Sequence, residues 1–228
     1  MKIKILKQII ENKKKLTEFL IITNLSTGDT KIIKKDTLLD KEFKKYSNQI
    51  DFFWKSKKNG IISDTNLFVE TFVRPIKVII VGAVHIAQYL VDYAKTLNFD
   101  IIIIDPRGYF ASEKRFPNVN IINKWPDEAF KEIETDKSSA LVALTHDPKI
   151  DDPALKHALD KKFFYIGALG SKKTHSNRCD RLKDAGYSNE QINLIHGPVG
   201  IKLGGKSASE IALSIISQLV FITNNRRF

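Results

Sequence analysis

The chain has 228 residues, of which 43% are hydrophobic, and it carries a formal net charge of +11. This length accommodates one large domain or two small domains, each with an apolar core. No run of 18 apolar residues occurs, so we expect no membrane span, and the single cysteine, Cys179, excludes an internal disulfide.

The first fifteen residues, MKIKILKQIIENKKK, have too short and too interrupted an apolar core for a secretory signal. Together with the lone cysteine, this predicts a cytoplasmic localisation. We find no obvious base beside Cys179 and interpret its thiol as incidental. The positive charge favours anionic partners, but the lysine runs lack interleaved aromatic residues, zinc-finger spacing and repeats, so we do not expect nucleic acid.

Residues 1–74 are predicted to form a small N-terminal domain that is α+β or β-rich. Four apolar or aromatic runs are strand candidates, and a hairpin-like turn cluster separates the first two. These runs lie at residues 19–23, 31–33, 51–54 and 67–72. We expect the boundary at Arg74-Pro75, because proline disfavours the continuation of a helix or a strand.

Residues 75–228 alternate strand-like and helix-like segments, and the strand-like runs are nearly uninterrupted Ile, Val and Leu. Such runs are typical of a parallel sheet that is buried on both faces. Strands are expected at 77–81, 100–105, 119–122, 139–145 and 163–167. Helices are expected at 85–97, 126–134, 152–161, 172–185 and 208–223.

Two of these helix starts carry capping chemistry. Asp152-Pro153 places an acid before a first-turn proline, and Ser207 with Glu210 forms a capping box. The whole pattern predicts an α/β fold, a Rossmann-like doubly wound parallel sheet. Ligands in such sheets lie beyond the carboxyl ends of the strands.

Residues 78–105 have the layout of a dinucleotide-binding βαβ unit: strand, glycine turn, helix, strand and acid. Gly82 fits the first glycine of that motif, but Val84 stands where a glycine normally lets the backbone approach a pyrophosphate. Asp105 has the spacing of a ribose-binding acid, although a surface acid that ends a strand is an equally good interpretation. Arg107 then pairs either with Asp105 or with a phosphate.

Thr145, His146 and Asp147 arrive together at the end of the strand expected at 139–145. A histidine holds or moves a proton near neutral pH, and a carboxylate orients it. The alternative is a capped turn with a satisfied histidine.

Gly170, Ser171 and Lys172 follow the strand expected at 163–167, directly before a helix that also carries Arg178. Glycine, hydroxyl and lysine at a helix start suit an anion, whereas the alternative is a solvated turn. The loop around Gly200 is equally open to a structural and a ligand-contacting interpretation.

Several motifs recur in a fixed order, and over roughly residues 67–222 the chain resembles the XdhC/CoxI family of molybdenum-hydroxylase accessory proteins. The family has GAGH-type, D-x-R, FP, THD, YIG-x-x-GS and PIG…EIA-type signatures. The matching stretches here are VIIVGAVHIAQ, DPRGYFASEKRFPN, ALTHDPKIDDPAL, YIGALGSKKTHSNR and GPVGIKLGGKSASEIALSI. Longer family members carry a cysteine-containing glycine motif in an N-terminal domain, whereas this chain has no cysteine before Cys179.

The resemblance implies a cofactor chaperone without turnover of its own. Its transient ligand would be the molybdenum cofactor, as molybdopterin or the dinucleotide form, and it would assist sulfuration and insertion of this cofactor. The implied partners are a xanthine dehydrogenase- or carbon monoxide dehydrogenase-type client, a cysteine desulfurase and a second copy in a homodimer.

The strand-end positions and the resemblance together predict one set of cofactor-binding residues and no metal site. The set comprises Gly82, Val84, His85, Asp105, Arg107, Thr145, His146, Gly170, Ser171, Lys172, Arg178 and Gly200. His146 and Asp147 are the catalytic candidates, should any reaction occur.

Two other functions stay open on the sequence alone. An NAD(P)-dependent oxidoreductase is motivated by Gly82, Ala87 and Asp105, with His146 as its acid or base. A nucleotide-sensing or protein-docking module is motivated by the βαβ pattern and the basic N-terminal third.

Overall fold

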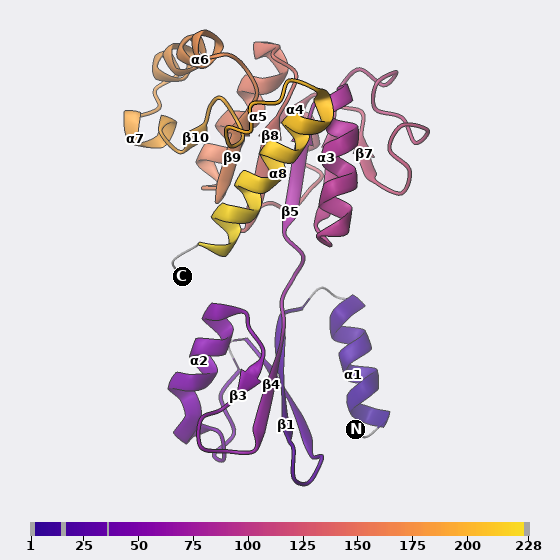
Figure 1. The fold of residues 1–228 in the computed structure, drawn as a ribbon, viewed down its shortest axis with the longest axis vertical. Coiled ribbons are helices and arrows are strands. Elements are labelled where there is room, and N and C mark those ends of the chain that lie inside the picture. Colours follow the sequence, from indigo (N-terminus) through magenta and orange to yellow (C-terminus); the bar gives the residue numbers. More distant parts are fainter. Residues whose placement is uncertain (1–2, 15–16, 36, 226–228) are drawn as a thin grey trace. The chain divides into compact units, whose positions relative to one another are not determined.

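The structure is a computed structural model that describes residues 3–14, 17–35 and 37–225. The chain forms two compact units that are divided between Arg74 and Pro75 (Figure 1). A small antiparallel sheet with helices makes up the first unit, and a parallel sheet with helices makes up the second.

The N-terminal unit is built on a four-stranded antiparallel sheet with the order β2-β1-β4-β3. Its strands are β1 (Phe19–Asn24), β2 (Thr30–Lys34), β3 (Gly60–Ile61) and β4 (Leu67–Phe72). The runs expected at 19–23, 31–33 and 67–72 are therefore confirmed as strands. The turn between β1 and β2 is held by the Asn24 side chain, whose Oδ1 accepts the backbone N–H groups of Ser26 and Thr27.

Helices complete the N-terminal unit: α1 (Ile3–Lys14), the short 3-10 helix η1 (Lys44–Tyr46) and α2 (Ser47–Ser56). The strand expected at 51–54 is wrong, because these residues lie inside α2. Ile50 and Phe53 are buried three residues apart, which is the spacing of one helical face, while Phe52 between them is 59% exposed. A short apolar run does not by itself distinguish a strand from a helix.

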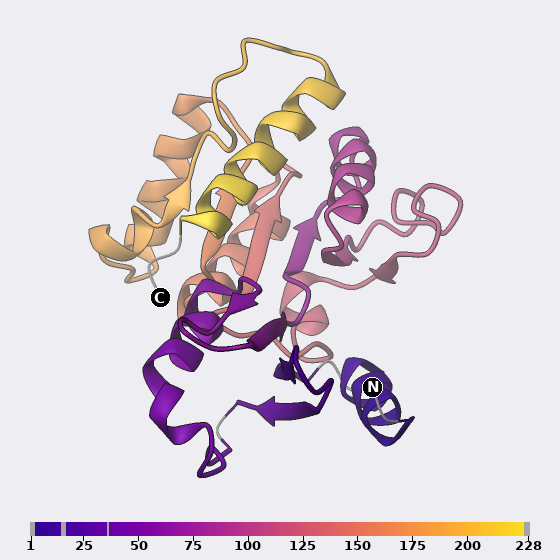
Figure 2. The ribbon, with the colours of Figure 1, turned by 60° about the horizontal axis from the view of Figure 1, so that its bottom comes forward.

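The C-terminal unit contains a six-stranded sheet in which every neighbouring pair is parallel, with the order β10-β9-β8-β5-β6-β7 (Figure 2). Its strands are β5 (Lys77–Val81), β6 (Asp100–Ile104), β7 (Asn120–Ile122), β8 (Ser139–Ala143), β9 (Tyr165–Ala168) and β10 (Ile195–His196). The chain runs from β5 outward to one edge and then from β8 outward to the other. This order confirms the doubly wound Rossmann-like fold and places its switch point between β5 and β8.

Helices cover both faces of this sheet, which explains the uninterrupted apolar strands. On β5, Val78 and Ile80 pack in one core with α3 (His85–Thr96) and α8 (Ala208–Asn224). Ile79 and Val81 pack in the opposite core. The helices that contribute to this second core are α4 (Pro126–Ala129), α5 (Pro148–Asp160), α6 (Lys172–Asp184) and α7 (Asn189–Ile192).

One helix start differs from the expectation. α5 begins at Pro148, where the Asp147 carboxylate accepts the Lys149 N–H at 2.9 Å, so a start at Asp152-Pro153 is wrong. The chain repeats the Asp-Pro pair five residues apart, and only the first pair caps the helix. Asp152 lies inside α5 and pairs with Arg181. The capping box of α8 is confirmed, and α4 is shorter than the expected 126–134.

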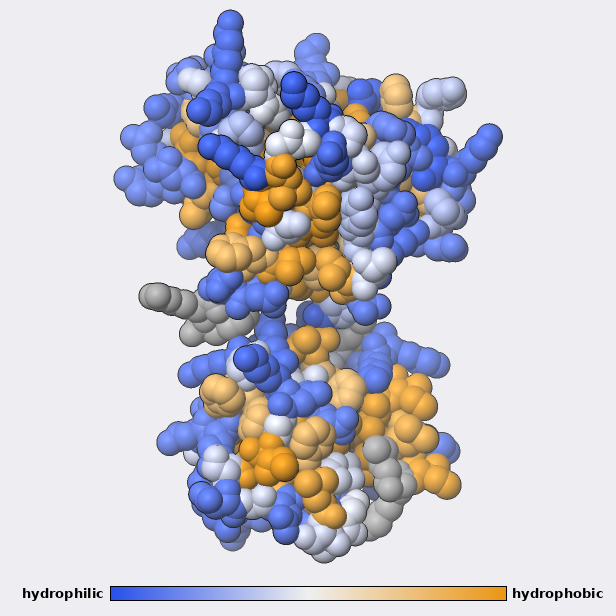
Figure 3. All heavy atoms as spheres, in the orientation of Figure 1, coloured by the Kyte–Doolittle hydropathy of each residue, from blue (hydrophilic) through white to orange (hydrophobic). Residues whose placement is uncertain are grey.

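The surface of the C-terminal unit carries apolar side chains along α8 (Figure 3), where Leu213 and Phe221 are 44% and 64% exposed. Hydrophilic side chains surround this strip in the same view. Within the described part of the chain, no helix combines the length and apolar content needed to cross a bilayer.

Candidate functional site

The loops after β5 and β8 meet at the switch point of the sheet. Gly82 has a φ of +106°, and a Cβ atom at this position would lie 2.6 Å from Cγ2 of Thr145. A side chain at Gly82 would therefore be strained by its backbone and would collide with the neighbouring loop. These two loops lie at the carboxyl edge of the sheet, where doubly wound proteins bind their ligands.

Asp105, at the end of β6, joins two loops through a completely buried carboxylate. Its Oδ2 accepts hydrogen bonds from the backbone N–H of Ala83 and from Nη2 of Arg107, both at 2.8 Å. Its Oδ1 accepts hydrogen bonds from the backbone N–H and from Nε of Arg107, both at 2.9 Å. Burial pushes the pKa of Asp105 upward, but the hydrogen bonds from Arg107 and Ala83 outweigh it, so the pKa is lowered. The surface-acid interpretation is wrong, and Arg107 pairs with Asp105.

Arg115, which the sequence patterns did not select, holds the glycine loop from another side. Its Nη1 donates to the carbonyl oxygens of Ala83 and Phe110 at 2.7 and 2.6 Å, and its Nη2 donates to Gln88 Oε1 at 3.1 Å. The signal available in the sequence was its place in the stretch DPRGYFASEKRFPN. An arginine inside a matched motif is a candidate of the same kind as Arg107.

Val84 and His85 begin α3. Val84 is the N-cap residue in an extended conformation and has no side-chain capping bond, which leaves the first turn without a polar side-chain cap. His85 is exposed, with its Nδ1 3.1 Å from Gln88 Oε1 and its ring edge-on to Tyr89. Both residues therefore stand at the helix N-terminus that faces the carboxyl edge of the sheet.

The turn after β8 is organised by Asp151, a buried acid on α5 that was not predicted. Its Oδ1 accepts the Thr145 hydroxyl at 2.6 Å, and its Oδ2 accepts the backbone N–H of His146 at 3.1 Å. Burial raises the pKa of Asp151 more than the Thr145 bonds lower it. His146 adopts a left-handed conformation with φ of +62°, and its side chain is exposed. Asp147 uses its carboxylate to cap α5.

A pocket of about 320 Å³ opens between this turn and α6. Its lining combines the turn residue His146 with Asp151 from α5 and with Lys173 and Arg178 from α6. Of the predicted set, His146 and Arg178 therefore share one pocket.

The other predicted residues of the β9 end lie outside that lining. Ser171 caps α6 by accepting the Thr174 N–H at 3.1 Å, and Lys172 is exposed at the first position of the helix. Gly170 has a φ of +146° just before this cap. Gly200 lies in the loop after β10, where its N–H donates to Gln218 Oε1 at 2.9 Å.

Arg178 is the most unusual side chain of the pocket because it is only 1% exposed. Its Nη2 donates to the Leu169 carbonyl at 2.8 Å and lies 3.8 Å from Asp151 Oδ2. Its Nε and Nη1 are buried and have no hydrogen-bond partner within the described residues. Buried polar groups are rarely left unpaired, which makes these two nitrogen atoms the most unusual feature of the pocket lining.

Cys179 has a neighbour that sequence reasoning overlooked. Its Sγ lies 3.6 Å from Nε2 of His175, one helical turn earlier on α6. Burial lowers the pKa of His175, and nearby Arg178 lowers it further, so the imidazole is disfavoured as a charged partner for a thiolate. The thiol therefore lies near an imidazole, which the sequence interpretation did not foresee.

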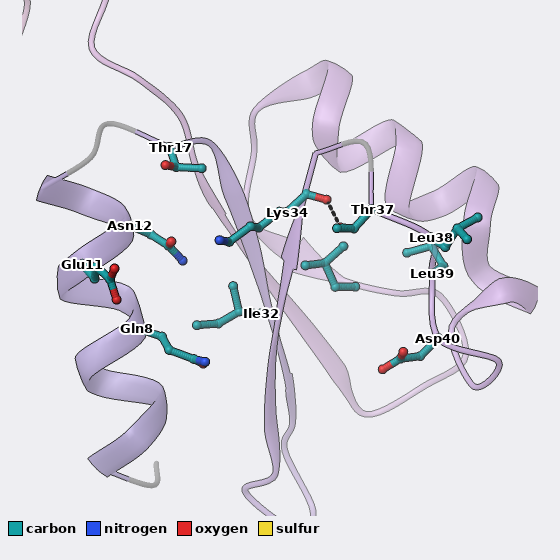
Figure 4. Close-up of a pocket in the computed structure, with 11 residues that line it drawn as sticks. Gln8, Glu11, Asn12, Thr17, Ile32, Lys34, Thr37, Leu38, Leu39 and Asp40 are labelled. Carbon is teal, nitrogen blue, oxygen red and sulfur yellow. Dashed lines mark hydrogen bonds between the residues drawn. The ribbon is translucent and has the colours of Figure 1, made fainter.

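A larger hollow, of about 420 Å³, lies in the N-terminal unit between α1 and residues 37–40 (Figure 4). Lys34 shares its lining with the acids Glu11 and Asp40. This hollow has no excess of positive charge and contains none of the predicted site residues. No group of three or more His, Cys, Asp or Glu in the described ranges is arranged to hold a metal ion.

The strand order and the glycine loop at the switch point define a Rossmann-type domain. A family model described as the XdhC Rossmann domain matches residues 78–219, more than half of the sequence. The chain belongs to the XdhC family.

Two curated relatives and one solved structure extend this comparison. The molybdenum cofactor insertion chaperone PaoD of Escherichia coli is 36% identical over 103 residues, which cover 45% of this chain and 32% of PaoD. A Bacillus subtilis protein named as a probable xanthine dehydrogenase subunit is 26% identical over 157 residues, covering 68% of this chain and 46% of that protein. The chain thus spans less than half of the length of either relative.

The solved structure is described as a xanthine dehydrogenase from Bacillus halodurans. It aligns with a TM-score of 0.73 at 21% sequence identity, covering 98% of this chain and 65% of that chain. At this level of identity, the likeness supports the fold.

Proposed function

We propose that this chain is an accessory protein that binds the molybdenum cofactor and assists its sulfuration and its insertion into a molybdenum hydroxylase. The observation that carries the proposal is the 36% identity to PaoD, a relative named as a molybdenum cofactor insertion chaperone. The proposed client is a xanthine dehydrogenase- or carbon monoxide dehydrogenase-type enzyme. The B. subtilis relative is named as a component of an enzyme of the first type.

The residues at the carboxyl edge fit this cargo. Molybdopterin ends in a phosphate, and its dinucleotide form contains a pyrophosphate. Arg178 offers two buried nitrogen atoms that have no hydrogen-bond partner among the described residues, and Lys173 lines the same pocket. A guanidinium is well suited to phosphate oxygens in geometry and in charge. We therefore assign the binding of the cargo to this edge of the sheet.

A non-catalytic role suits the contacts of the two catalytic candidates. Asp147 caps α5, so its carboxylate is engaged and does not orient an imidazole. His146 is held through its backbone by Asp151, while its side chain is exposed at the pocket. We propose that His146 contacts the cargo and that Asp147 only shapes the turn.

The nicotinamide alternative has weaker support. Each oxygen of Asp105 already accepts two hydrogen bonds, and the carboxylate is completely buried, which leaves little capacity for a ribose hydroxyl. Val84 occupies the N-cap position of α3 in place of the usual glycine, at the point where a pyrophosphate would approach.

The decisive experiment is a titration of the purified full chain with isolated molybdenum cofactor, in its oxo and sulfurated forms. We expect saturable binding by calorimetry and co-elution of the pterin in gel filtration. A parallel titration with NAD and NADP is expected to give no heat. Failure of both cofactor forms to bind, while an established cofactor-binding protein binds the same preparation, would refute the proposal.

The roles of the implied partners stay predictions that rest on the resemblance. They are a homodimer and a cysteine desulfurase that supplies sulfur. Cytoplasmic localisation stays a prediction from the first fifteen residues and the single cysteine. Addition of the loaded protein to the cofactor-free client tests insertion directly, because restored client activity requires transfer of the cargo.

A further inference from the structure

The pocket between the β8 turn and α6 contains a cation whose hydrogen-bonding capacity is only partly used. Arg178 is 1% exposed, and its Nη2 donates to the Leu169 carbonyl oxygen. The Nε and Nη1 atoms carry three N–H bonds between them and have no partner in the described part of the chain. A buried guanidinium in this state is incomplete without an acceptor.

The nearby carboxylates do not supply that acceptor. Both carboxylate oxygens of Asp151 accept hydrogen bonds from the turn after β8. Its Oδ2 lies 3.8 Å from Nη2 of Arg178, which already donates to Leu169. Asp152 accepts Nε and Nη2 of Arg181 at 2.6 and 2.9 Å, which is a two-pronged ion pair. These two acids therefore leave Nε and Nη1 of Arg178 unmatched.

The surroundings add positive potential. Lys173 lines the pocket from the first turn of α6, a thirteen-residue helix whose N-terminus carries a partial positive charge. The pocket volume of about 320 Å³ lies at the lower end of the roughly 300–1,000 Å³ of small-molecule pockets, so a tetrahedral oxyanion fits together with part of an organic group.

We propose that this pocket binds the phosphate group of a phosphate ester. The phosphate oxygens accept hydrogen bonds from Nε and Nη1 of Arg178, and the phosphate forms an ion pair with Lys173. The inference rests on the proposed function, because it assigns the phosphate of the molybdenum cofactor to this pocket. The phosphate comes from the end of molybdopterin or from the pyrophosphate of the dinucleotide form. Both sources share this chemistry.

The test uses the full chain and three probes: inorganic phosphate, and the oxidised pterin derivative of the cofactor with and without its phosphate. Binding is measured by calorimetry, and for inorganic phosphate also by ³¹P NMR line broadening. We expect the phosphorylated derivative to bind more tightly than the dephosphorylated one, and we expect inorganic phosphate to compete with it. The same competition against the intact molybdopterin form and the intact dinucleotide form of the cofactor distinguishes the two sources.

Three variants localise the site. Arg178→Gln removes the buried donors and is expected to weaken binding of the phosphorylated derivative by roughly 10- to 100-fold, the range for hydrogen bonds to a charged group. Lys173→Gln changes an exposed rim residue without disturbing the core, and we expect a loss of about 3-fold. Lys183→Gln removes an equal charge from an exposed position of α6 outside the pocket lining, and it serves as the matched control with unchanged affinity.

Each outcome decides between the two proposals. If the phosphate adds nothing to pterin binding, or if Arg178→Gln and Lys173→Gln bind like Lys183→Gln, this inference fails while the proposed function stands. If inorganic phosphate binds through Arg178 and the intact cofactor does not bind, the pocket assignment stands while the proposed function fails. Should Arg178→Gln not fold, Lys173→Gln against Lys183→Gln still gives the answer.

Discussion

Asp105→Ala tests the buried clamp that joins the loops after β5 and β6. The change removes the carboxylate oxygen that accepts the backbone N–H of Ala83 at 2.8 Å, and it also frees the N–H of Arg107. We expect the C-terminal unit to lose stability, because a buried donor without an acceptor retains the full cost of its desolvation.

The magnitude follows from the burial of each partner. The Ala83 N–H is buried and accounts for about 2 kcal/mol, while the partly buried Arg107 N–H accounts for about 1 kcal/mol. The Arg107 side chain is 40% exposed, so screening by solvent limits its ion pair to about 0.5 kcal/mol. The expected loss is therefore about 3 to 4 kcal/mol, and Asp105→Asn, which keeps one carbonyl oxygen, is expected to lose about half as much.

Urea unfolding at pH 7 measures this loss. Trp54→Phe leaves Trp125 as the reporter of the C-terminal unit, since the chain has two tryptophans and one lies in each unit. Asp92→Ala, at an exposed position of α3, is the control and is expected to change stability by less than about 0.5 kcal/mol.

The pH dependence gives a second check on the same clamp. Because the pKa of Asp105 is lowered below its ordinary 3.8, its contribution is present above this value and disappears as the pH falls through the lowered pKa. The difference between wild type and Asp105→Ala must therefore shrink in acid. An Asp105→Ala protein as stable as Asp92→Ala at pH 7 would show that the carboxylate does not hold these loops.

Two further predictions concern packing and acid sensitivity. Gly82→Ala places a Cβ 2.6 Å from Thr145 at a φ of +106°, and we expect a loss of about 2 to 4 kcal/mol in urea unfolding. Gly186→Ala has a similar φ of +92° but nothing within 4 Å, so it is expected to lose only about 1 kcal/mol, and equal losses would contradict the steric argument. Burial against Phe130 lowers the pKa of His157 in the folded protein below its ordinary 6.5. As the pH falls, the imidazole is therefore protonated more readily in the unfolded chain than in the folded one. The free energy of unfolding is expected to decrease as the pH drops below about 6.5. His157→Gln should flatten this fall in thermal melts between pH 7.5 and 5.5, and an unchanged slope would exclude His157 as its source.

The sequence predicts at which edge of the sheet the candidate site lies, but it does not predict which residues line the pocket. Polar residues directly after predicted parallel strands must gather at one edge, and this argument selected His146. Arg178 was selected because it lies on the helix that follows the next such turn. It also selected Lys172, but the pocket is lined by Lys173, because one residue along a helix turns the side chain by about 100°. No spacing rule identified Asp151, whose importance comes from its burial under the β8 turn.

The two units differ in how well local pattern predicts them. In the C-terminal unit, long apolar runs separated by amphipathic helices leave little ambiguity, and the expected strands and the Rossmann-like order are confirmed. In the N-terminal unit, residues 51–54 were mistaken for a strand and α1 was not predicted. Its helices are short, and their apolar residues are interrupted by charges, so packing on the small sheet decides their conformation.

The amino-acid sequence alone determined the alternation of strand and helix, the glycine turn at Gly82 and the family resemblance, because each of these depends on residue type and local spacing. Only the tertiary structure decided that Asp105 is buried against Arg107 and that Arg178 lies in a pocket with two nitrogen atoms unpaired among the described residues. Burial and hydrogen-bond satisfaction depend on which distant segments meet, and residue type and local spacing therefore do not reveal them.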